Sequence, residues 1–524
     1  MGELTLVTFV PAGRSAQVAP GTTLLKAAAE AGVVVPAPCG GRGACGRCAV
    51  SVVDGDLALP SQRETAALAR ARAAGSGMRL ACLAEIGGPV TVRPLGGTTR
   101  LVSGGHAAER AELLVAGVDL GTTSVAVQLV DPVRRTVVGT ARVPNRQASF
   151  GSDVLSRIAA AIGGDSDALA EAAGDSVADA LTAAIESTGL AGVRVERIVL
   201  AGNTAMTSLL AGVEVTGLAS HPFSHAMAGT TRLQRGSLAD RYPGTEIVLV
   251  PPVAAFVGGD LVAGMIAEGL SDEAEGSLFV DLGTNAEVAA VTGGRCVVAS
   301  APAGPAFEGW GIACGGQAGA GGIVAMLPSE SGGMSPILDG DRETHITGSG
   351  LISATALLLR TGHLDEAGLL HADGPAAERF FELDGVRAVT LCTDPRDREV
   401  FLTQLDVRAL QSAKGAVCAA VKAVAREASL TGKRLAEIVL AGAFGGALET
   451  DDLVALGVVP IQSAGLLRYA PDAAARGAAA MALEPGLLED ARELMSGAVH
   501  VDLASGTTFA DEFMACVRLA PYSL

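Results

Sequence analysis

Two short motifs recur in the same order along the chain, and this duplication constrains the fold more than any other feature. The first is an apolar run that ends in Asp-Leu-Gly-Thr, at residues 119–122 and again at 281–284. The second is Ile-Val-Leu-Ala-Gly, at residues 198–202 and again at 438–442. Because the two motifs alternate, the sequence predicts two similar lobes that face one another.

Each Asp-Leu-Gly-Thr motif is typical of a strand that enters a hairpin through a glycine turn. Backbone N–H groups and threonine hydroxyls at such a turn can bind phosphate oxygens, and an aspartate at the strand end can hold a hydrated magnesium ion. A single copy would indicate only a buried strand and a tight turn, but two copies within a wider duplication favour nucleotide binding. No Walker motif occurs, and Thr-Gly-Lys-Arg at 431–434 does not supply one.

On these motifs the chain resembles the superfamily of actin, sugar kinases and heat-shock chaperones, the ASKHA proteins. DLGTTS (119–124) and DLGTNAE (281–287) match its two phosphate motifs, and LAGAFG (440–445) matches its adenosine motif. The resemblance implies ATP and Mg²⁺ as cofactors, with Asp119 and Asp281 positioning the magnesium ion and the attacking water. The implied nucleotide-binding residues are Gly121, Thr122, Thr123, Gly283, Thr284, Asn285, Gly442 and Gly445.

Two further acidic residues lie in apolar, glycine-containing segments. Asp260 ends Val-Gly-Gly-Asp, and Glu308 lies in Pro-Ala-Phe-Glu-Gly. Both are candidates for positioning water or closing the cleft, and we count Asp260 among the candidate catalytic residues. A buried structural carboxylate is the alternative interpretation for each.

Four cysteines in the first 82 residues have the spacing C-x5-C-x2-C-x33-C, and they are Cys39, Cys45, Cys48 and Cys82. Glycines between the first three allow backbone conformations in which the thiolates turn inward around a compact inorganic cluster. Zinc is the competing metal, but its structural sites usually have two separated C-x2-C pairs or Cys-His pairs. The Gly-x-Gly-x-x-Gly at 41–46 is not taken as a dinucleotide motif, because strand-like residues follow it where that motif opens a helix.

The residues around these cysteines predict a small α+β domain, with strands at 3–10 and 48–56 and a capped helix at 22–32. Residues 1–96 resemble the plant-type and adrenodoxin-type ferredoxins. This implies a ferredoxin-like β-grasp fold and a 2Fe-2S cluster bound by the four cysteines. The other cysteines show no ligand spacing and are expected to be buried small hydrophobes; they are Cys296, Cys314, Cys392, Cys418 and Cys516.

Charge divides the chain at the same place as the motifs do. Residues 1–96 carry nine Lys and Arg against six Asp and Glu, whereas the rest carries 29 against 50. We expect a ferredoxin domain at 1–96, a linker at 97–113 and, at 114–524, an α/β two-lobed ribonuclease-H-like ATPase domain of the actin and sugar-kinase type. Its two lobes are expected at about 114–278 and 279–524.

The composition also bears on partners and location. A formal net charge of −18 disfavours nucleic acid, because phosphate binding depends on clustered Lys and Arg. The most apolar run, at 247–259, contains two prolines and is shorter than the about 20 residues that span a bilayer. The first residues lack the basic and apolar regions of a signal peptide. We therefore expect no membrane partner and a cytoplasmic location.

The pairing of a ferredoxin with this ATPase resembles the reductive activators of corrinoid proteins across nearly the whole chain. Further matching segments are PPVAAFVGGD, SAPAGPAFEG, ITGSGLISA and TQLDVRALQSAKGAV. The resemblance implies ATP-dependent transfer of one electron from the 2Fe-2S cluster to the Co(II) corrinoid of a methyltransferase-system protein, which restores Co(I). It also implies an external electron donor and suggests a homodimer.

One departure concerns the C-terminal tail, which has only Cys516 and so lacks the extra cysteine clusters of related activators that carry 4Fe-4S centres. Two alternatives stay open. The chain could be an ATP-dependent electron donor to another low-potential enzyme, or a nucleotide-binding redox sensor without turnover.

Overall fold

The computed structural model describes residues 4–524 except 11–13, 32, 34, 36–47, 71–77, 95–101, 104–112, 152, 191, 228, 271–275, 317–320, 329–333, 340–344, 374–376, 394–398, 431–434, 443–447 and 506–507. Three predicted site residues, Cys39, Cys45 and Gly445, lie outside the described residues. The chain forms two compact units, residues 1–271 with 472–497 and residues 272–471 with 498–524. No helix among the described residues is long and apolar enough to cross a membrane.

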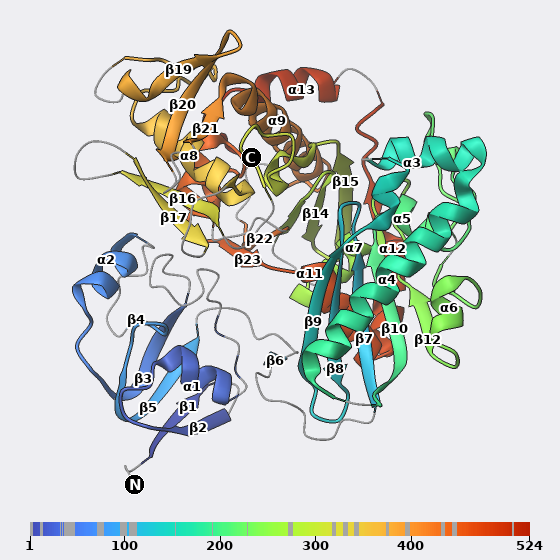
Figure 1. Cartoon of the computed structure of the whole chain (residues 1–524), viewed down its shortest axis with the longest axis horizontal. Helices are drawn as coiled ribbons and strands as arrows, with labels where there is room; N and C mark the ends of the chain where they lie inside the picture. Colours follow the sequence, from blue (N-terminus) through green and yellow to red (C-terminus); the bar gives the residue numbers. More distant parts are fainter. Residues whose placement is uncertain are drawn as a thin grey trace. The chain divides into compact units, whose positions relative to one another are not determined.

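The N-terminal part forms a five-stranded mixed sheet in the order β2-β1-β5-β3-β4 (Figure 1). Its elements are β1 (Thr5–Phe9), β2 (Arg14–Val18), α1 (Leu24–Glu30), β3 (Ala49–Leu57), α2 (Gln62–Arg70), β4 (Met78–Leu80) and β5 (Ile86–Pro94). Strand β1 follows the period of two expected from its sequence, since Val7 and Phe9 are buried, whereas Leu6, which precedes Val7, is exposed. It pairs antiparallel with β2 and parallel with β5. This topology confirms the predicted β-grasp fold.

The first lobe of the larger part of the chain is built on a seven-stranded sheet in the order β11-β12-β10-β7-β8-β9-β6. Its strands are β6 (Val102–Ser103), β7 (Leu113–Leu120), β8 (Ser124–Asp131), β9 (Thr136–Pro144), β10 (Arg194–Gly202), β11 (Thr231–Arg232) and β12 (Glu246–Leu249). Its helices are η1 (Arg146–Ser149), α3 (Val154–Ala160), η2 (Ala161–Asp165), α4 (Ser166–Thr188), α5 (Thr204–Leu210), η3 (Thr216–Leu218), α6 (Ser237–Arg241), α7 (Gly259–Glu268), α11 (Ala473–Leu483) and α12 (Gly486–Gly497). Strand β6 falls within the segment predicted as a linker and pairs with β9 at the sheet edge.

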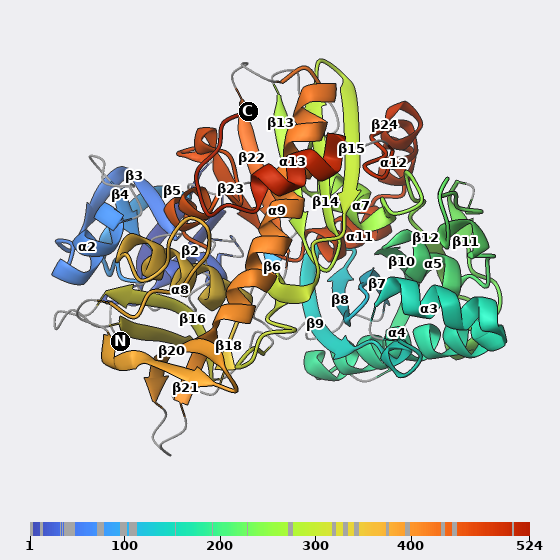
Figure 2. The same ribbon diagram turned by 90° about the horizontal axis from the view of Figure 1, so that it is seen from above.

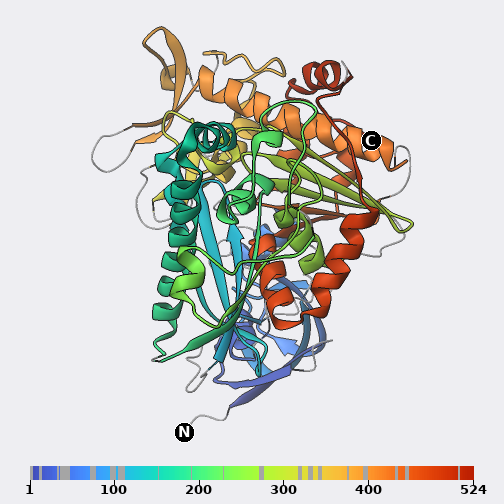
Figure 3. The same cartoon turned by 90° about the vertical axis from the view of Figure 1, so that its right-hand side faces the viewer.

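Helices cover both faces of this sheet, as Figure 3 shows: α4 packs on β8 and β9, and α11 packs on β7 and β10. Strand β7 is therefore buried along most of its length, which explains why its sequence is continuously apolar rather than alternating. Because β7 is held on both faces, the position of the Asp-Leu-Gly-Thr turn at its end is fixed relative to the sheet.

Helix α11 lies late in the chain but belongs to the first compact unit. A Cβ atom on Gly117 of β7 would lie 2.1 Å from the backbone nitrogen of Ala479, and one on Gly477 would lie 1.8 Å from the carbonyl oxygen of Ala263. Helix α11 thus packs on its neighbours almost backbone to backbone, which its alanine-rich sequence permits. The motif order predicts a second lobe at about 279–524, whereas residues 472–497 return to the first unit.

The second lobe is built on a six-stranded sheet in the order β23-β22-β13-β14-β15-β24. Its strands are β13 (Ser277–Leu282), β14 (Ala286–Thr292), β15 (Arg295–Ala301), β22 (Glu437–Ala441), β23 (Leu467–Ala470) and β24 (Val499–His500). Two three-stranded sheets accompany it, formed by β16 (Gly322–Pro328), β17 (Met334–Asp339) and β18 (His345–Ile346) and by β19 (Phe380–Leu383), β20 (Val386–Thr393) and β21 (Glu399–Thr403).

The helices of the second lobe are η4 (Pro305–Glu308), α8 (Gly348–Arg360), η5 (Ala377–Arg379), α9 (Gln404–Glu427), α10 (Thr450–Leu456), η6 (Ile461–Ser463) and α13 (Thr508–Cys516). The long helix α9 packs on β14 and β15, and α13 packs on α9 (Figure 2). A single apolar cluster fills the space between α8, α9 and the main sheet.

The two lobes repeat one core. The strand orders β9-β8-β7-β10-β12 and β15-β14-β13-β22-β23 are equivalent. The registers are equivalent as well, because Asp119 pairs with Ala201 in the first lobe and Asp281 pairs with Ala441 in the second. The duplicated motifs thus occupy matching positions, and the predicted two-lobed ribonuclease-H-like class is confirmed.

Candidate functional site

The first phosphate motif forms the turn of the β7–β8 hairpin. Gly121, Thr122 and Thr123 make the turn and are half-buried, as is Asp119 at the end of β7. The Gly121 N–H donates to the carbonyl oxygen of Ser124 at 3.1 Å, which closes the hairpin. A Cβ atom on Gly121 would lie 2.8 Å from the same oxygen, so this tight closure requires glycine. The turn presents backbone and hydroxyl donors at the end of a rigid strand pair.

Asn145 holds this turn in place, although the sequence analysis did not single it out. Its side-chain Nδ2 donates to the carbonyl oxygen of Gly121 at 2.9 Å, and its backbone N–H donates to that of Thr123 at 2.9 Å. Its Oδ1 accepts from the N–H of Gln147 at 2.9 Å and so caps η1. Only 1% of Asn145 is exposed. Because Asn145 is buried and makes all three hydrogen bonds, it holds the hairpin in one position relative to η1.

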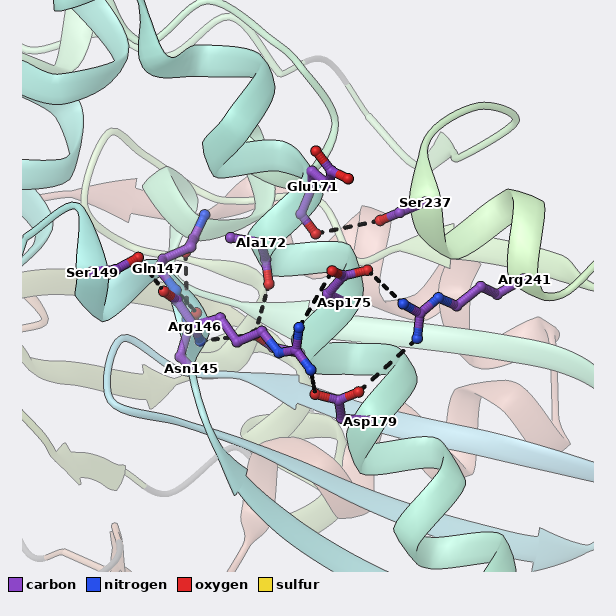
Figure 4. Close-up of polar contacts among 11 residues, drawn as sticks. Asn145, Arg146, Gln147, Ser149, Glu171, Ala172, Asp175, Asp179, Ser237 and Arg241 are labelled. Atoms are coloured by element: carbon purple, nitrogen blue, oxygen red, sulfur yellow. Dashed lines mark hydrogen bonds and ion pairs between the residues drawn. The ribbon is translucent and has the colours of Figure 1, made fainter.

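An ion-pair network fixes the segment that carries Asn145 (Figure 4). The Arg146 N–H donates to Ser176 Oγ at 2.9 Å, and its guanidinium pairs with Asp175 and Asp179 of α4. Arg241 pairs with the same two carboxylates, at 3.0 Å to Asp175 and 4.0 Å to Asp179. Because these arginines are about half exposed, each pair adds little stability. Their shared geometry nonetheless sets the position of η1 relative to α4.

Two loops approach the first hairpin from neighbouring strands. A Cβ atom on Gly202, at the end of β10, would lie 2.6 Å from the carbonyl oxygen of Leu120. A Cβ atom on Gly258 would lie 2.4 Å from the carbonyl oxygen of Gly202 and 2.5 Å from Asp260 Oδ1. The structure therefore brings Asp260, in the first turn of α7, close to the carboxyl-terminal end of β7, where Asp119 lies. Asp260 is half-buried there, with its Oδ1 accepting from the Leu261 N–H at 3.0 Å.

The second phosphate motif forms the turn of the β13–β14 hairpin, made by Gly283, Thr284 and Asn285. All three residues and Asp281 are half-buried. Glu308, at the end of η4, accepts two hydrogen bonds on one oxygen, from the Thr284 N–H at 2.9 Å and from Thr284 Oγ1 at 3.0 Å. Its carboxylate thus occupies the Thr284 N–H and hydroxyl, the two donors predicted to bind phosphate. An incoming phosphate at this turn would compete with Glu308 for them.

The adenosine motif begins beside Asp281, because β22 runs parallel to β13. Gly442 follows the last residue of β22 and has φ of 131°, a conformation that favours glycine. The Tyr469 hydroxyl donates to its carbonyl oxygen at 2.9 Å. The second lobe therefore brings Asp281, the Gly283–Asn285 turn and Gly442 together at the carboxyl-terminal ends of β13 and β22. Tyr469 supports Gly442, and sequence reasoning did not identify it.

Two of the four predicted cluster ligands are described, and they lie together. The Sγ atoms of Cys48 and Cys82 are 3.2 Å apart, and the residues are 1% and 7% exposed. Two sulfurs on a tetrahedral metal with bonds of about 2.3 Å lie about 3.8 Å apart, so this separation is near that of two ligands to one ion. Cys48 precedes β3 and Cys82 follows β4, and the Ala81 N–H donates to the Cys48 carbonyl oxygen at 2.8 Å. The described residues therefore fit a cysteine-bound cluster.

A buried ion pair supports the strand that leads to Cys82. Glu64 of α2 is fully buried and binds Arg79 of β4 through two contacts, at 2.8 and 3.0 Å. The same carboxylate accepts from the Leu80 N–H at 2.8 Å. Because a buried carboxylate is costly unless all its contacts are made, this pair fixes β4 two residues before the ligand.

Comparison with known proteins agrees with this architecture. Three family models match successive parts of the chain: the 2Fe-2S iron-sulfur cluster binding domain at 7–86, the RACo middle region at 114–273, and the C-terminal domain of RACo, the ASKHA domain, at 275–523. A solved structure described as a reductive activator for corrinoid, iron-sulfur protein matches with a TM-score of 0.73, at 24% identity, over 98% of each chain. This likeness establishes the fold.

Two curated relatives are similar in sequence. The corrinoid activation enzyme RamQ of Eubacterium limosum is 27% identical over 409 residues, which are 76% of this chain and 68% of the relative. The Co(II) methylated amine-specific corrinoid protein reductase of Methanosarcina barkeri is 28% identical over 359 residues, and the match spans 62% of each protein. With all three domain models matched in order, the chain belongs to the RACo family, which joins a 2Fe-2S domain to an ASKHA domain.

Proposed function

We propose that this protein is an ATP-dependent reductive activator. It transfers one electron from a 2Fe-2S cluster to the Co(II) corrinoid of a methyltransferase-system protein and so restores Co(I). The observation that carries the proposal is the presence, in one chain, of a 2Fe-2S domain and an ASKHA fold with RACo family matches. The names of the two curated relatives supply the substrate class, since one refers to corrinoid activation and the other to reduction of a Co(II) corrinoid protein.

The cluster ligands in this proposal are Cys39, Cys45, Cys48 and Cys82. When bound, the cluster carries a single electron at roughly −400 mV if it resembles the plant-type centres. The protein's own contribution is to bury the Cys48 and Cys82 thiols beside one another and to fix β4 through Glu64 and Arg79. An external donor protein or reductant is proposed to reload the domain.

The two hairpins are proposed to bind ATP and Mg²⁺. Asp119 and Asp281 would hold the hydrated magnesium ion, and the turn residues that follow each aspartate would donate to phosphate oxygens. Gly442 and Gly445 would lie against the adenosine. Asp260 would orient water near the first hairpin. Glu308 would release Thr284 when phosphate arrives, so that phosphate binding and the position of η4 become linked.

If ATP favours one conformation 10⁴-fold, its binding supplies enough free energy for the electron transfer. Co(II) corrinoids accept an electron only at very low potential. A ligand that favours one conformation 10⁴-fold makes about 5.5 kcal/mol available. For a one-electron couple each tenfold factor corresponds to about 59 mV, so this energy offsets about 240 mV. A conformational change driven by ATP is therefore large enough to close the gap left by a plant-type centre.

The proposal is tested by anaerobic absorption spectroscopy of a candidate corrinoid protein in the Co(II) state. Catalytic amounts of this protein and excess reductant should produce Co(I) when ATP is present, and at least tenfold more slowly when ATP is withheld. ATP hydrolysis should rise when the corrinoid protein is added. No Co(I) and no stimulated hydrolysis with any corrinoid protein tested, despite an intact cluster and bound ATP, would favour another electron acceptor or a redox sensor.

Replacing Asn145 with alanine should weaken ATP binding about tenfold, because the carbonyl oxygen of Gly121 loses its donor and the first hairpin loses its support. The free energy of unfolding of the first lobe should fall by about 1–3 kcal/mol. Titration calorimetry with ATP and denaturant unfolding measure the two effects. Ser149→Ala is the matched control, because it removes only a contact to the Arg146 carbonyl oxygen in the same turn. A folded Asn145→Ala protein with unchanged ATP affinity would contradict this role.

A further inference from the structure

Two cysteines outside the cluster domain meet in the second compact unit. Cys418 lies on α9 and Cys516 ends α13, 98 positions later in the sequence, and their Sγ atoms are 2.7 Å apart. Both are free thiols and both are buried, with 1% and 3% of each residue exposed. Their spacing in the sequence predicts only buried small hydrophobes, and both residues are indeed buried. The fold brings them together as a pair.

The surroundings of the pair favour one thiolate. Lys414 and Lys422 lie one helical turn before and after Cys418 on α9. Lys414 is 1% exposed and donates to the Arg518 carbonyl oxygen at 2.6 Å, and Lys422 pairs with Glu512 at 3.1 Å. A hydrogen bond from Cys418 lowers the pKa of Cys516, and the two lysines lower it further, whereas burial and Glu512 oppose the shift. The same bond raises the pKa of Cys418.

The pair joins the C-terminal segment to the body of the unit. That segment is otherwise held by separate hydrogen bonds: Gln411 Nε2 donates to the Val517 carbonyl oxygen at 2.9 Å, and the Leu519 N–H donates to that of Glu366 at 2.8 Å. The ring of Tyr522 lies 5.4 Å from the Lys422 ammonium. A covalent bond between the cysteines would join α13 to α9 at the centre of these contacts.

We propose that Cys418 and Cys516 are a reversible redox pair that peroxide oxidises to a disulfide, which fixes the C-terminal helix to α9. In the first step the Cys516 thiolate attacks an oxygen of hydrogen peroxide, an S–O bond forms and the O–O bond breaks, and the departing hydroxide takes up the proton that the Cys516 thiol had released and leaves as water. In the second step the Cys418 sulfur displaces that oxygen as a second water. Two thiols and one peroxide thus yield one disulfide and two waters, and a dithiol reductant reverses the change. The inference does not depend on the proposed activator function.

The test uses the full-length protein, purified without oxygen and exposed to hydrogen peroxide. Free thiols are then alkylated under denaturing conditions, and the peptides are mapped by mass spectrometry. We expect a peptide pair linked through Cys418 and Cys516 that disappears on treatment with dithiothreitol. Oxidation should raise Tm by about 5–15 °C, because the link closes a long loop in the unfolded chain. This mapping separates the pair from the cluster cysteines, which lie in other peptides.

Matched variants complete the test. Cys516→Ser should lose the linked peptide and the peroxide-induced rise in Tm, whereas Cys296→Ser, at a buried cysteine on β15, should keep both. Lys422→Gln should slow formation of the link several-fold, because it removes a cation that favours the thiolate. Full alkylation of both cysteines after peroxide, or oxidation of Cys516 to a sulfinic acid without a link, in the wild-type protein overturns the proposal.

Discussion

Replacing Cys82 with alanine should abolish reduction of the corrinoid, with a loss of at least 100-fold in the rate of Co(I) formation. The variant lacks one of four thiolates, and a cluster held by three cannot keep its iron firmly. The visible absorption of the 2Fe-2S centre and the bound iron should both disappear. ATP affinity should stay within twofold of wild type, because the predicted nucleotide residues all lie beyond residue 118. Absorption spectroscopy, iron analysis and ATP titration measure the three effects.

The control for this variant is Cys296→Ser, which removes a buried thiol from the second lobe and should leave the cluster spectrum unchanged. Metal analysis of the wild-type protein adds a sharper test. Two irons and two labile sulfides per chain are expected. One zinc ion per chain after anaerobic purification, with no visible absorption, would contradict the cluster assignment and support the zinc alternative.

The β-grasp domain and the duplicated core could be predicted because their signals are local. The alternation around Val7 and Phe9 specifies a half-buried strand, and the apolar run before Asp119 specifies a strand buried on both faces. The glycine turns after Asp119 and Asp281 then mark where each strand ends. Each of these signals lies within one short segment, so a single sequence is sufficient to predict the strands and turns.

The position of helix α11 could not be predicted, because its signal is spread over distant segments. Its many alanines indicate close packing but do not identify the packing partner. Only the structure shows that the partner is β7, where Gly117 leaves room for Ala479. No local sequence pattern shows where the chain leaves the second lobe and returns to the first, at residue 472. Sequence order alone therefore gave a simpler division between the lobes.

The supports of the site were missed for a related reason. Asn145 contacts Gly121 from 24 positions away, and Glu64 contacts Arg79 from 15 positions away, so neither spacing matches a helix or strand period. Cys418 and Cys516 are separated further still. Polar residues of this kind become recognisable only when burial and hydrogen bonds are known.

Replacing Asp281 with asparagine should abolish ATP-driven electron transfer to the corrinoid while leaving the cluster intact. Asparagine keeps the size of the side chain, but it lacks the negative charge that would hold the hydrated magnesium ion beside the second hairpin. We expect ATP hydrolysis, measured with the corrinoid protein present, to fall by about 10²–10³-fold, the usual cost of removing one electrostatic contact from a transition state. The 2Fe-2S absorption should be unchanged, because Asp281 and the cysteines lie in different compact units.

Asp490→Asn is the matched control, since it makes the same chemical change at an exposed position of α12. It should hydrolyse ATP at the wild-type rate. The decisive comparison is between Asp281→Asn and Cys82→Ala. The first should keep a reducible cluster and lose hydrolysis, and the second should keep ATP binding and lose the cluster, so that each fails to form Co(I) for a different reason. If Asp281→Asn still produced Co(I) at the wild-type rate with ATP, magnesium at the second hairpin would not be needed for electron transfer.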